Sequence, residues 1–208
     1  MPAYAYGILA AGWLAWMPRF ILLSIRRKTA RPAKLDRRAR WGMLFIAVAY
    51  TLVWQGNFWT RSPGPWRMVI SALLFIVASV LSWTSTRALG RHWRLDAGLN
   101  ADHEPVQSGP YRLVRHPIYT SMFCMLLGTG VVLATPLPLL LPSLLMLVIG
   151  TEIRVRIEDR LLASQFGEQF LDYRRRVPAY IPFVKQSFSQ SPAATGQSGD
   201  HDKGSPRL

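Results

Sequence analysis

Two clusters of ionisable and aromatic residues, separated by a long apolar stretch, carry the side chains that could do chemistry in this sequence. The first is GPYRLVRHPIY at residues 109–119, and the second is RVRIED at residues 154–159. Together they supply hydrogen-bond donors, cations and carboxylates: Arg115, His116, Tyr119, Arg154, Glu158 and Asp159. Carboxylates bind cationic groups and hydroxyls, whereas arginine binds anions. A site that joins the two clusters would suit a ligand with charges of both signs.

The first cluster has the pattern of a turn that leads into a helix. Pro117 suits the first helical turn, where its missing N–H costs nothing. We expect Arg115 and His116 to lie at the membrane surface, where the free N–H groups of the helix N-terminus could receive a carboxylate. The alternative is that Arg115 extends towards lipid headgroups and His116 is an ordinary surface residue.

The second cluster predicts an amphipathic helix that starts at about Glu152. Arg154 and Glu158 are four residues apart, as are Glu152 and Arg156. Pairs at this spacing stabilise helices and by themselves indicate nothing more.

The elements that must position these clusters are apolar helices. Half of the 208 residues are hydrophobic, which is more than a small soluble domain buries. We therefore predict an all-α, polytopic integral membrane protein with about five transmembrane helices and a cytoplasmic C-terminal segment that binds a cofactor. The expected crossings are residues 4–25, 41–59 and 66–83, followed by a two-helix hairpin over 118–153 that is interrupted by Pro136, Pro138 and Pro142.

The basic residues predict the orientation of these helices. Lys and Arg total 25 against 11 Asp and Glu, and they are concentrated in blocks between the apolar stretches. Because cytoplasmic loops carry this excess, we expect the N-terminus outside and the C-terminus in the cytoplasm. The expected location is a bacterial inner membrane. The apolar stretches outweigh the other meaning of a net charge of +14, so no nucleic-acid partner is expected.

The two clusters and their spacing resemble a known family. Arg-His-Pro-x-Tyr at 115–119, a hydrophobic region and then Glu158 with Asp159 are similar to the cofactor signature of the isoprenylcysteine carboxyl methyltransferase family, which is related to the phospholipid methyltransferases. The resemblance extends over about residues 89–183. Further matching positions are Leu162, Phe166, Gly167, Tyr173, Val177, Ile181 and Pro182.

The resemblance implies an integral membrane enzyme that uses S-adenosyl-L-methionine to methylate a lipophilic small molecule or a prenylated substrate from the lipid bilayer. It implies cofactor binding by Tyr111, His116, Tyr119, Glu158 and Asp159. Asp159 stands where the family has a second glutamate, so its reach is one methylene shorter, and we expect Glu158 to be the essential acid. The expected units are three helices in 1–86, the methyltransferase core in 87–185 and a disordered tail in 186–208.

The catalytic residues depend on the acceptor. A carboxylate, such as that of an isoprenylcysteine-like substrate, needs no general base because it is already ionised. Arg154 is then the first candidate to clamp the acceptor, followed by Arg115 and Arg91. If the acceptor is a lipid amine or a thiol, His116, His103 or Tyr119 would have to accept a proton.

Two other functions compete with methyl transfer. A membrane reductase of the sterol or steroid type would bind a nicotinamide cofactor, and a non-catalytic membrane protein would use its basic loops to bind anionic lipid. No metal site is expected, because Cys124 is the single cysteine and no histidine pair has helical spacing; His92 and His103 are expected to be loop residues. Cys124, Gly128 and Gly130 are expected to serve helix packing.

Overall fold

The computed structural model describes residues 1–26, 34–35, 37–56, 62–90, 98–99 and 106–182. Within these ranges the regular structure is helical except for one antiparallel pair of two-residue strands, β1 (Lys34–Leu35) and β2 (Gly98–Leu99). The helices are α1 (Ala3–Trp16), α2 (Pro18–Arg26), α3 (Ala39–Val53), α4 (Pro65–Leu89), the 3₁₀ helix η3 (Gly109–Arg112), α5 (Pro117–Val132), α6 (Leu137–Phe166) and α7 (Glu168–Arg176).

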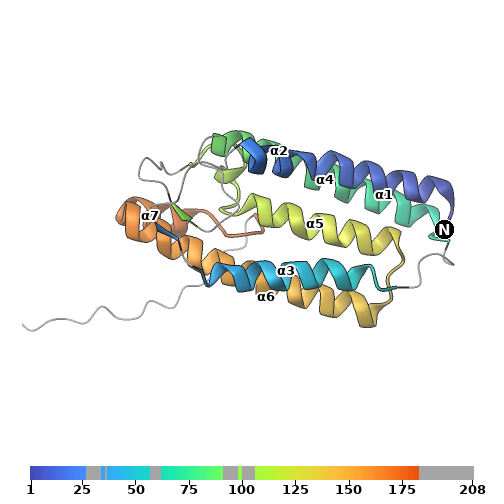
Figure 1. Ribbon diagram of the computed structural model, residues 1–208. Coiled ribbons are helices and arrows are strands. Elements are labelled where there is room, and N and C mark those ends of the chain that lie inside the picture. Colours follow the sequence, from blue (N-terminus) through green and yellow to red (C-terminus); the bar gives the residue numbers. More distant parts are fainter. Residues whose placement is uncertain (27–33, 36, 57–61, 91–97, 100–105, 183–208) are drawn as a thin grey trace, which may run out of the picture.

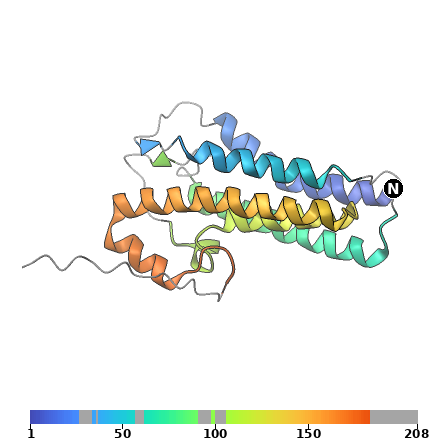
Figure 2. The ribbon, with the colours of Figure 1, turned by 90° about the horizontal axis from the view of Figure 1, so that it is seen from below.

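The long helices alternate in direction along the chain and form a bundle in which α5 lies between two packed groups (Figures 1 and 2). On one side α4 packs against α5 and also against α1, and on the other side α3 packs against α6. The N-terminus lies at one end of the bundle, and α7 lies at the opposite end. The bundle thus brings the start of α5 and the end of α6, which carry the two sequence clusters, to the end that holds α7.

Three segments are long and apolar enough to cross a membrane: Ala3–Leu22, Pro65–Leu89 and Leu137–Phe166. The helices α3 and α5 are also apolar but shorter. At 1.5 Å per residue they extend about 23 and 24 Å, compared with a hydrocarbon core of about 30 Å. The expected all-α membrane architecture is therefore confirmed at the level of apolar helices.

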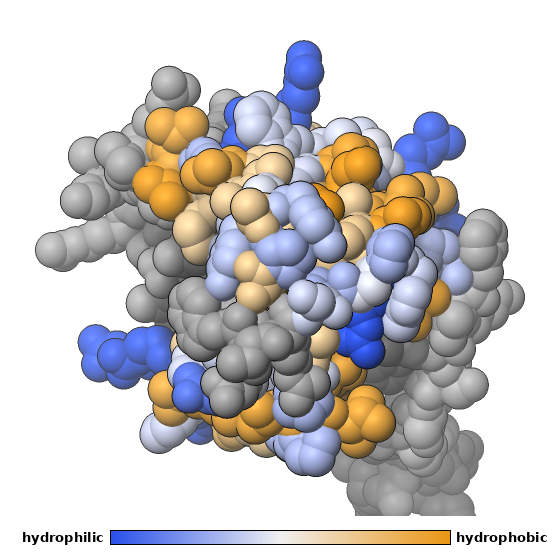
Figure 3. Space-filling model, turned by 90° about the vertical axis from the view of Figure 1, so that its right-hand side faces the viewer, coloured by the Kyte–Doolittle hydropathy of each residue, from blue (hydrophilic) through white to orange (hydrophobic). Residues whose placement is uncertain are grey.

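The residue pattern on α4 is typical of a helix that faces lipid. Its buried side is rich in small residues, such as Ser71, Ala78 and Ser82, which let neighbouring helices approach closely. Its exposed side carries large apolar residues: Trp66, Val69, Leu73, Ile76, Val80 and Trp83. At the end of the bundle nearest the N-terminus, most strongly hydrophilic side chains in view project from the margins (Figure 3).

The helix boundaries differ from the expected crossings where local chemistry intervenes. The first crossing is divided between α1 and α2, because Pro18 has no N–H to continue the ladder of α1. The second helix ends at Val53, before the expected end at 59, and the third continues to Leu89. The expected glycine packing is confirmed, since a Cβ at Gly128 would lie 2.7 Å from Phe75. Cys124 likewise packs against the core.

The turn of the hairpin between α5 and α6 consists of residues 133–136. Of the three prolines, only Pro136 lies in this turn. Pro136 precedes α6, Pro138 lies in the first turn of α6, and Pro142 lies inside the helix. From Leu137, α6 continues without interruption to Phe166, so the amphipathic helix expected from Glu152 is the second half of the same helix. Its 30 residues extend about 45 Å, which exceeds the hydrocarbon thickness.

Candidate functional site

The chain after α7 packs against the start of α5 through its backbone. The N–H of Arg115 donates to the carbonyl of Pro178 at 2.8 Å, and the N–H of His116 donates to the carbonyl of Ala179 at 2.9 Å. One turn later the hydroxyl of Thr120 donates to the carbonyl of Tyr180 at 2.9 Å. The two N–H groups that lead into α5 are therefore used within the protein, in contrast to the expectation that they would receive a ligand carboxylate.

Arg115 forms a buried ion pair with Asp159. The Nη1 atom of Arg115 donates to Oδ2 of Asp159, and its Nε donates to the carbonyl of Val177 at 2.9 Å. The two side chains are only 3% and 8% exposed. Such a pair is costly to break, because either partner alone would be a buried, uncompensated charge. The alternative of an Arg115 side chain extended towards lipid headgroups is wrong.

His116 lies between the two acidic residues of the second cluster. Its Nε2 is 3.0 Å from Oδ1 of Asp159, and its Nδ1 is 3.6 Å from Oε2 of Glu158. The ring is buried, with 7% of the side chain exposed. His116 therefore connects two carboxylates that project from successive positions of α6.

Tyr119, Arg154 and Glu158 form a second polar group beside the first. The hydroxyl of Tyr119 donates to Oε1 of Glu158 at 2.5 Å and accepts from Nε of Arg154 at 2.6 Å. The Nη2 atom of Arg154 also donates to Oε1 of Glu158 at 3.3 Å, which confirms the expected pairing at i and i+4. The Glu158 side chain is 25% exposed, so it is the more accessible of the two carboxylates.

A hydrogen bond between Tyr173 and Tyr111 connects α7 to η3. The hydroxyl of Tyr173 donates to the backbone carbonyl of Tyr111 at 2.6 Å. Burial raises the pKa of Tyr173 above its ordinary value, although the charge of Arg115 acts in the opposite direction. Burial, assisted by the charge of Glu158, also raises the pKa of Tyr111. Both hydroxyls therefore stay protonated at neutral pH and act as neutral groups.

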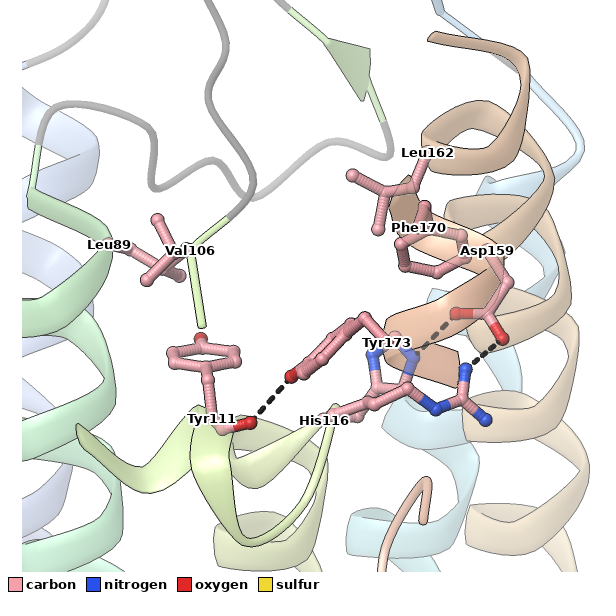
Figure 4. Close-up of a pocket in the computed structure, with 9 residues that line it drawn as sticks. Leu89, Val106, Tyr111, His116, Asp159, Leu162, Phe170 and Tyr173 are labelled. Atoms are coloured by element: carbon pink, nitrogen blue, oxygen red, sulfur yellow. Dashed lines mark hydrogen bonds and ion pairs between the residues drawn. The ribbon is translucent and has the colours of Figure 1, made fainter. Parts of the chain in front are cut away.

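A cavity of about 80 Å³ lies between η3, α6 and α7 (Figure 4). Its polar lining is Arg115, His116 and Asp159, its aromatic lining is Tyr111, Phe170 and Tyr173, and its aliphatic lining is Leu89, Val106 and Leu162. In Figure 4 the bonded His116 and Asp159 lie along one side, and Leu89 and Val106 lie across from them. The cavity thus combines apolar and aromatic walls with an ionised edge.

The structure brings together every site residue expected from the two clusters. Tyr111, His116 and Asp159 line the cavity, and Tyr119 and Glu158 lie beyond His116. Arg91, His92 and His103 lie outside the described residues. Among the described residues, no group of three His, Cys, Asp or Glu side chains could hold a metal ion.

Some lining residues were not expected to belong to the site. Tyr173 is one of the positions that match the family, but no role is assigned to it from the sequence, and Phe170 is assigned none either. Their spacing of three places both on one face of α7, which is the signal that could have identified them. Tyr180 was also missed: its hydroxyl donates to Oε2 of Glu152 at 3.2 Å, and its ring centroid is 6.3 Å from that of His116.

Comparison with known proteins identifies relatives of this arrangement. A family model described as phospholipid methyltransferase matches residues 66–169, which is half of the chain. Protein-S-isoprenylcysteine O-methyltransferase from Tribolium castaneum is 31% identical over 122 residues, which cover 58% of this chain and 43% of that protein.

Two bacterial proteins match a larger share of their own length. The nickel-cobalt-cadmium resistance protein NccN from Alcaligenes xylosoxydans xylosoxydans is 32% identical over 182 residues, covering 81% of this chain and 78% of NccN. The cobalt-zinc-cadmium resistance protein CzcN from Cupriavidus metallidurans is 34% identical over 157 residues, covering 61% of this chain and 66% of CzcN. The matched part of the chain thus covers from under half to about three quarters of the length of these relatives.

The family match includes α4, α5 and α6 and so contains both clusters that meet at the cavity. The similarity to isoprenylcysteine O-methyltransferases, expected from the two clusters, is confirmed by several relatives of that name. On both grounds, the chain belongs to the phospholipid methyltransferase family.

Proposed function

We propose that this protein transfers the methyl group of S-adenosylmethionine to a lipophilic acceptor that enters from the bilayer. The observation that carries the proposal is the position of His116, with one ring nitrogen 3.0 Å from Asp159 and the other 3.6 Å from Glu158, at the edge of an aromatic cavity. Family membership and the names of the relatives support methyl transfer as the reaction class.

The lining residues fit the cofactor chemically. Tyr111, Phe170 and Tyr173 provide faces for an aromatic base, and the carboxylates of Glu158 and Asp159 suit an ammonium group or ribose hydroxyls. The cavity of about 80 Å³ is smaller than the 300 Å³ or more that whole-ligand pockets usually occupy, so it accommodates part of the cofactor. When bound, the cofactor supplies a methyl group made electrophilic by its sulfonium.

The first candidate acceptor is the carboxylate of an isoprenylcysteine-type molecule, as the names of several relatives suggest. This nucleophile is ionised at neutral pH, so the protein must position it and exclude water rather than remove a proton. Arg154 is the candidate clamp. Because its guanidinium donates to both Tyr119 and Glu158, an incoming carboxylate would have to replace Glu158 as its partner.

A second acceptor class, a lipid amine or a thiol, has one observation in its favour. Such an acceptor must lose a proton during the reaction, and His116 lies at the edge of the cavity, where its ring contacts two carboxylates. Under this alternative Asp159 and Glu158 would orient the histidine, and Arg115 would hold Asp159 in place.

We infer that the three long apolar segments and the two shorter helices α3 and α5 all cross the membrane, and that the site faces the cytoplasm. The antiparallel arrangement supports this topology, because α3 and α5 each run alongside a segment long enough to span. The excess of Lys and Arg near the end that holds α7 supports a cytoplasmic location for that end. A bacterial inner membrane is the expected location.

Calorimetry with the detergent-purified protein tests cofactor binding. We expect micromolar binding of S-adenosylmethionine to the native chain and its loss in His116→Ala and Glu158→Gln. Glu168→Gln is the matched control, since Glu168 is exposed on α7 and contacts only Arg175 in the described part of the chain. Binding of NADPH in place of S-adenosylmethionine would contradict the proposal and favour the reductase alternative.

Transfer of a labelled methyl group identifies the acceptor class. An S-prenylated cysteine with a free carboxylate should be labelled, and its methyl ester should not. Labelling of a long-chain amine or thiol, with no labelling of the prenylated cysteine, would replace the first acceptor class by the second.

A further inference from the structure

Two tryptophan–arginine pairs stand at opposite ends of the lipid-facing side of α4. The guanidinium of Arg67 lies 5.0 Å from the ring centroid of Trp66, and that of Arg19 lies 5.4 Å from the ring centroid of Trp83. The two tryptophans are 59% and 49% exposed. They are separated by about 25 Å of helix, close to the thickness of the hydrocarbon core, and tryptophan favours both membrane interfaces. Trp83 therefore marks the interface at the end that holds the cavity.

Arg19 is fixed in position by several contacts to α4. Its Nε donates to the hydroxyl of Thr86 at 3.1 Å, and Thr86 is buried and donates in turn to the carbonyl of Ser82 at 2.7 Å. The indole N–H of Trp83 donates to the carbonyl of Ala15 at 2.8 Å, which ties α4 to α1 just before the break at Pro18. The cation is thus held against an immobilised aromatic ring.

The charge of Arg19 is not balanced within the described part of the chain. No carboxylate among these residues lies within 4.0 Å of its guanidinium, and its hydrogen bond to Thr86 uses only the Nε–H. The terminal nitrogens keep a planar fork of N–H donors, a geometry that matches two oxygens of a phosphate. Beside Trp83 at the membrane interface, such a cation lies at the level of the lipid phosphates.

Arg87 provides a second cation on the same face. It follows Trp83 by four residues on α4, and this spacing places the two side chains one above the other. Arg87 is exposed in the last turn of the helix, and no ion pair connects it to another residue in the ranges that the structure describes. Arg19 contacts the indole of Trp83 and Arg87 follows Trp83 by one helical turn, so the two arginines form a basic patch at the membrane interface.

We propose that Arg19 and Arg87 bind the phosphate of a bilayer phospholipid beside Trp83. A lipid is favoured over free phosphate because Val80 and Ile76, exposed on the same side of α4, offer a surface for its acyl chains. A lipid with net negative charge should bind better than a zwitterionic one, since two cations face a single phosphate. The site is independent of methyl transfer.

Native mass spectrometry of the detergent-purified protein tests this site with phosphatidylglycerol and phosphatidylcholine as probes. We expect the native chain to retain one phosphatidylglycerol in preference to phosphatidylcholine, and Arg19→Gln to weaken retention about tenfold, as expected for the loss of a charge-assisted pair. Arg19→Lys, which keeps the charge but lacks the planar fork, should give a smaller loss in a protein that stays folded. Arg67→Gln is the matched control and should retain the lipid.

Two results would overturn the proposal. An equal loss in Arg19→Gln and Arg67→Gln would show that general charge, rather than this site, attracts the lipid. Thermal stabilisation of the native chain by millimolar inorganic phosphate, absent in Arg19→Gln, together with no preferential retention of phosphatidylglycerol, would assign the site to a free anion. Unchanged cofactor binding in Arg19→Gln would keep this test separate from that of the methyltransferase site.

Discussion

Gly42 on α3 gives the side chain of Arg154 on α6 the space that it occupies. A Cβ atom at position 42 would lie 2.6 Å from Cγ of Arg154 and 2.7 Å from the carbonyl oxygen of Gly150. The two helices therefore cross where both are glycine, and the stem of Arg154 passes over the crossing. A helix outside the segment matched by the family model thus sets the position of a candidate site residue.

Gly42→Ala should lower both stability and cofactor affinity. Inserting a methyl group into this contact must displace Arg154 or separate the helices, at a cost of about 1–3 kcal/mol. Thermal unfolding and calorimetry with S-adenosylmethionine measure the two effects. Gly7→Ala is the control, because nothing lies within 4 Å of a Cβ at Gly7, and alanine is the better helix former. Equal stability of Gly42→Ala and the native chain would contradict the packing argument.

Asp159→Asn should destabilise the protein severely. The change leaves the buried guanidinium of Arg115 without its carboxylate partner, a loss of about 3–5 kcal/mol for pairs of this kind. Asp172→Asn is the same substitution at an exposed ion pair with Arg175 and should have little effect. Chemical denaturation of the three proteins in one detergent makes the comparison. Similar midpoints for both variants would show that the buried pair has no special role.

The neighbouring acids Glu158 and Asp159 show which features of the site the sequence could not predict. The two clusters were enough to predict that His116 and the acids of α6 meet, and that Arg154 pairs with Glu158. They could not show which acid faces Arg115, because neighbouring helical residues point about 100° apart and the rotation of α6 depends on its packing against α3. The shorter reach of an aspartate places Glu158 above Asp159 as the essential acid, whereas the structure gives Asp159 the buried ion pair and a place in the cavity lining.

In the fold, too, local sequence predicted some features, whereas others depend on contacts between distant segments. The apolar stretches predicted the helices, because burial in lipid needs long runs of apolar residues whatever their partners. The proline content of 136–142 predicted an interruption, but proline is compatible with the first helical turn and Pro142 is accommodated inside α6. The contact between Gly42 and Arg154 depends on two helices from distant parts of the sequence, and no local pattern predicts it.

Tyr119→Phe should weaken cofactor binding with only a small loss of stability. The hydroxyl connects Glu158 to Arg154, so its removal leaves the carboxylate less ordered, and we expect about a tenfold lower affinity. Tyr50→Phe is the matched control, since the hydroxyl of Tyr50 donates to the carbonyl of Met122 at 2.9 Å, away from the acids. Unchanged affinity in Tyr119→Phe would remove Tyr119 from the binding site.

Stability should fall at alkaline pH. Burial raises the pKa values of Tyr111, Tyr173 and Tyr180 in the folded protein, whereas unfolded tyrosines ionise near pH 10. Because the unfolded chain releases protons first, the stability from these groups is fully present below about pH 10 and is lost as the pH rises above it. Unfolding temperatures measured from pH 8 to 11.5 test this dependence.

Tyr173→Phe provides the control for the alkaline effect. At pH 8 the variant should lose about 1 kcal/mol with its hydrogen bond to Tyr111. Above pH 10 its stability should decline less steeply than that of the native chain, because one of the ionising groups is gone. Parallel curves over the whole range would exclude Tyr173 as a source of the pH dependence.

The continuity of α6 has a mechanical consequence. The same helix that runs through the bundle from Leu137 carries Glu158 and Asp159 near its far end, and no loop separates the two parts. A change in the tilt of this helix must therefore move both acids relative to Arg115 and His116, which precede α5. Membranes with shorter or longer acyl chains impose different tilts on a spanning helix. The rate of the proposed methyl transfer should consequently respond to bilayer thickness, with an optimum where the lengths of helix and membrane agree.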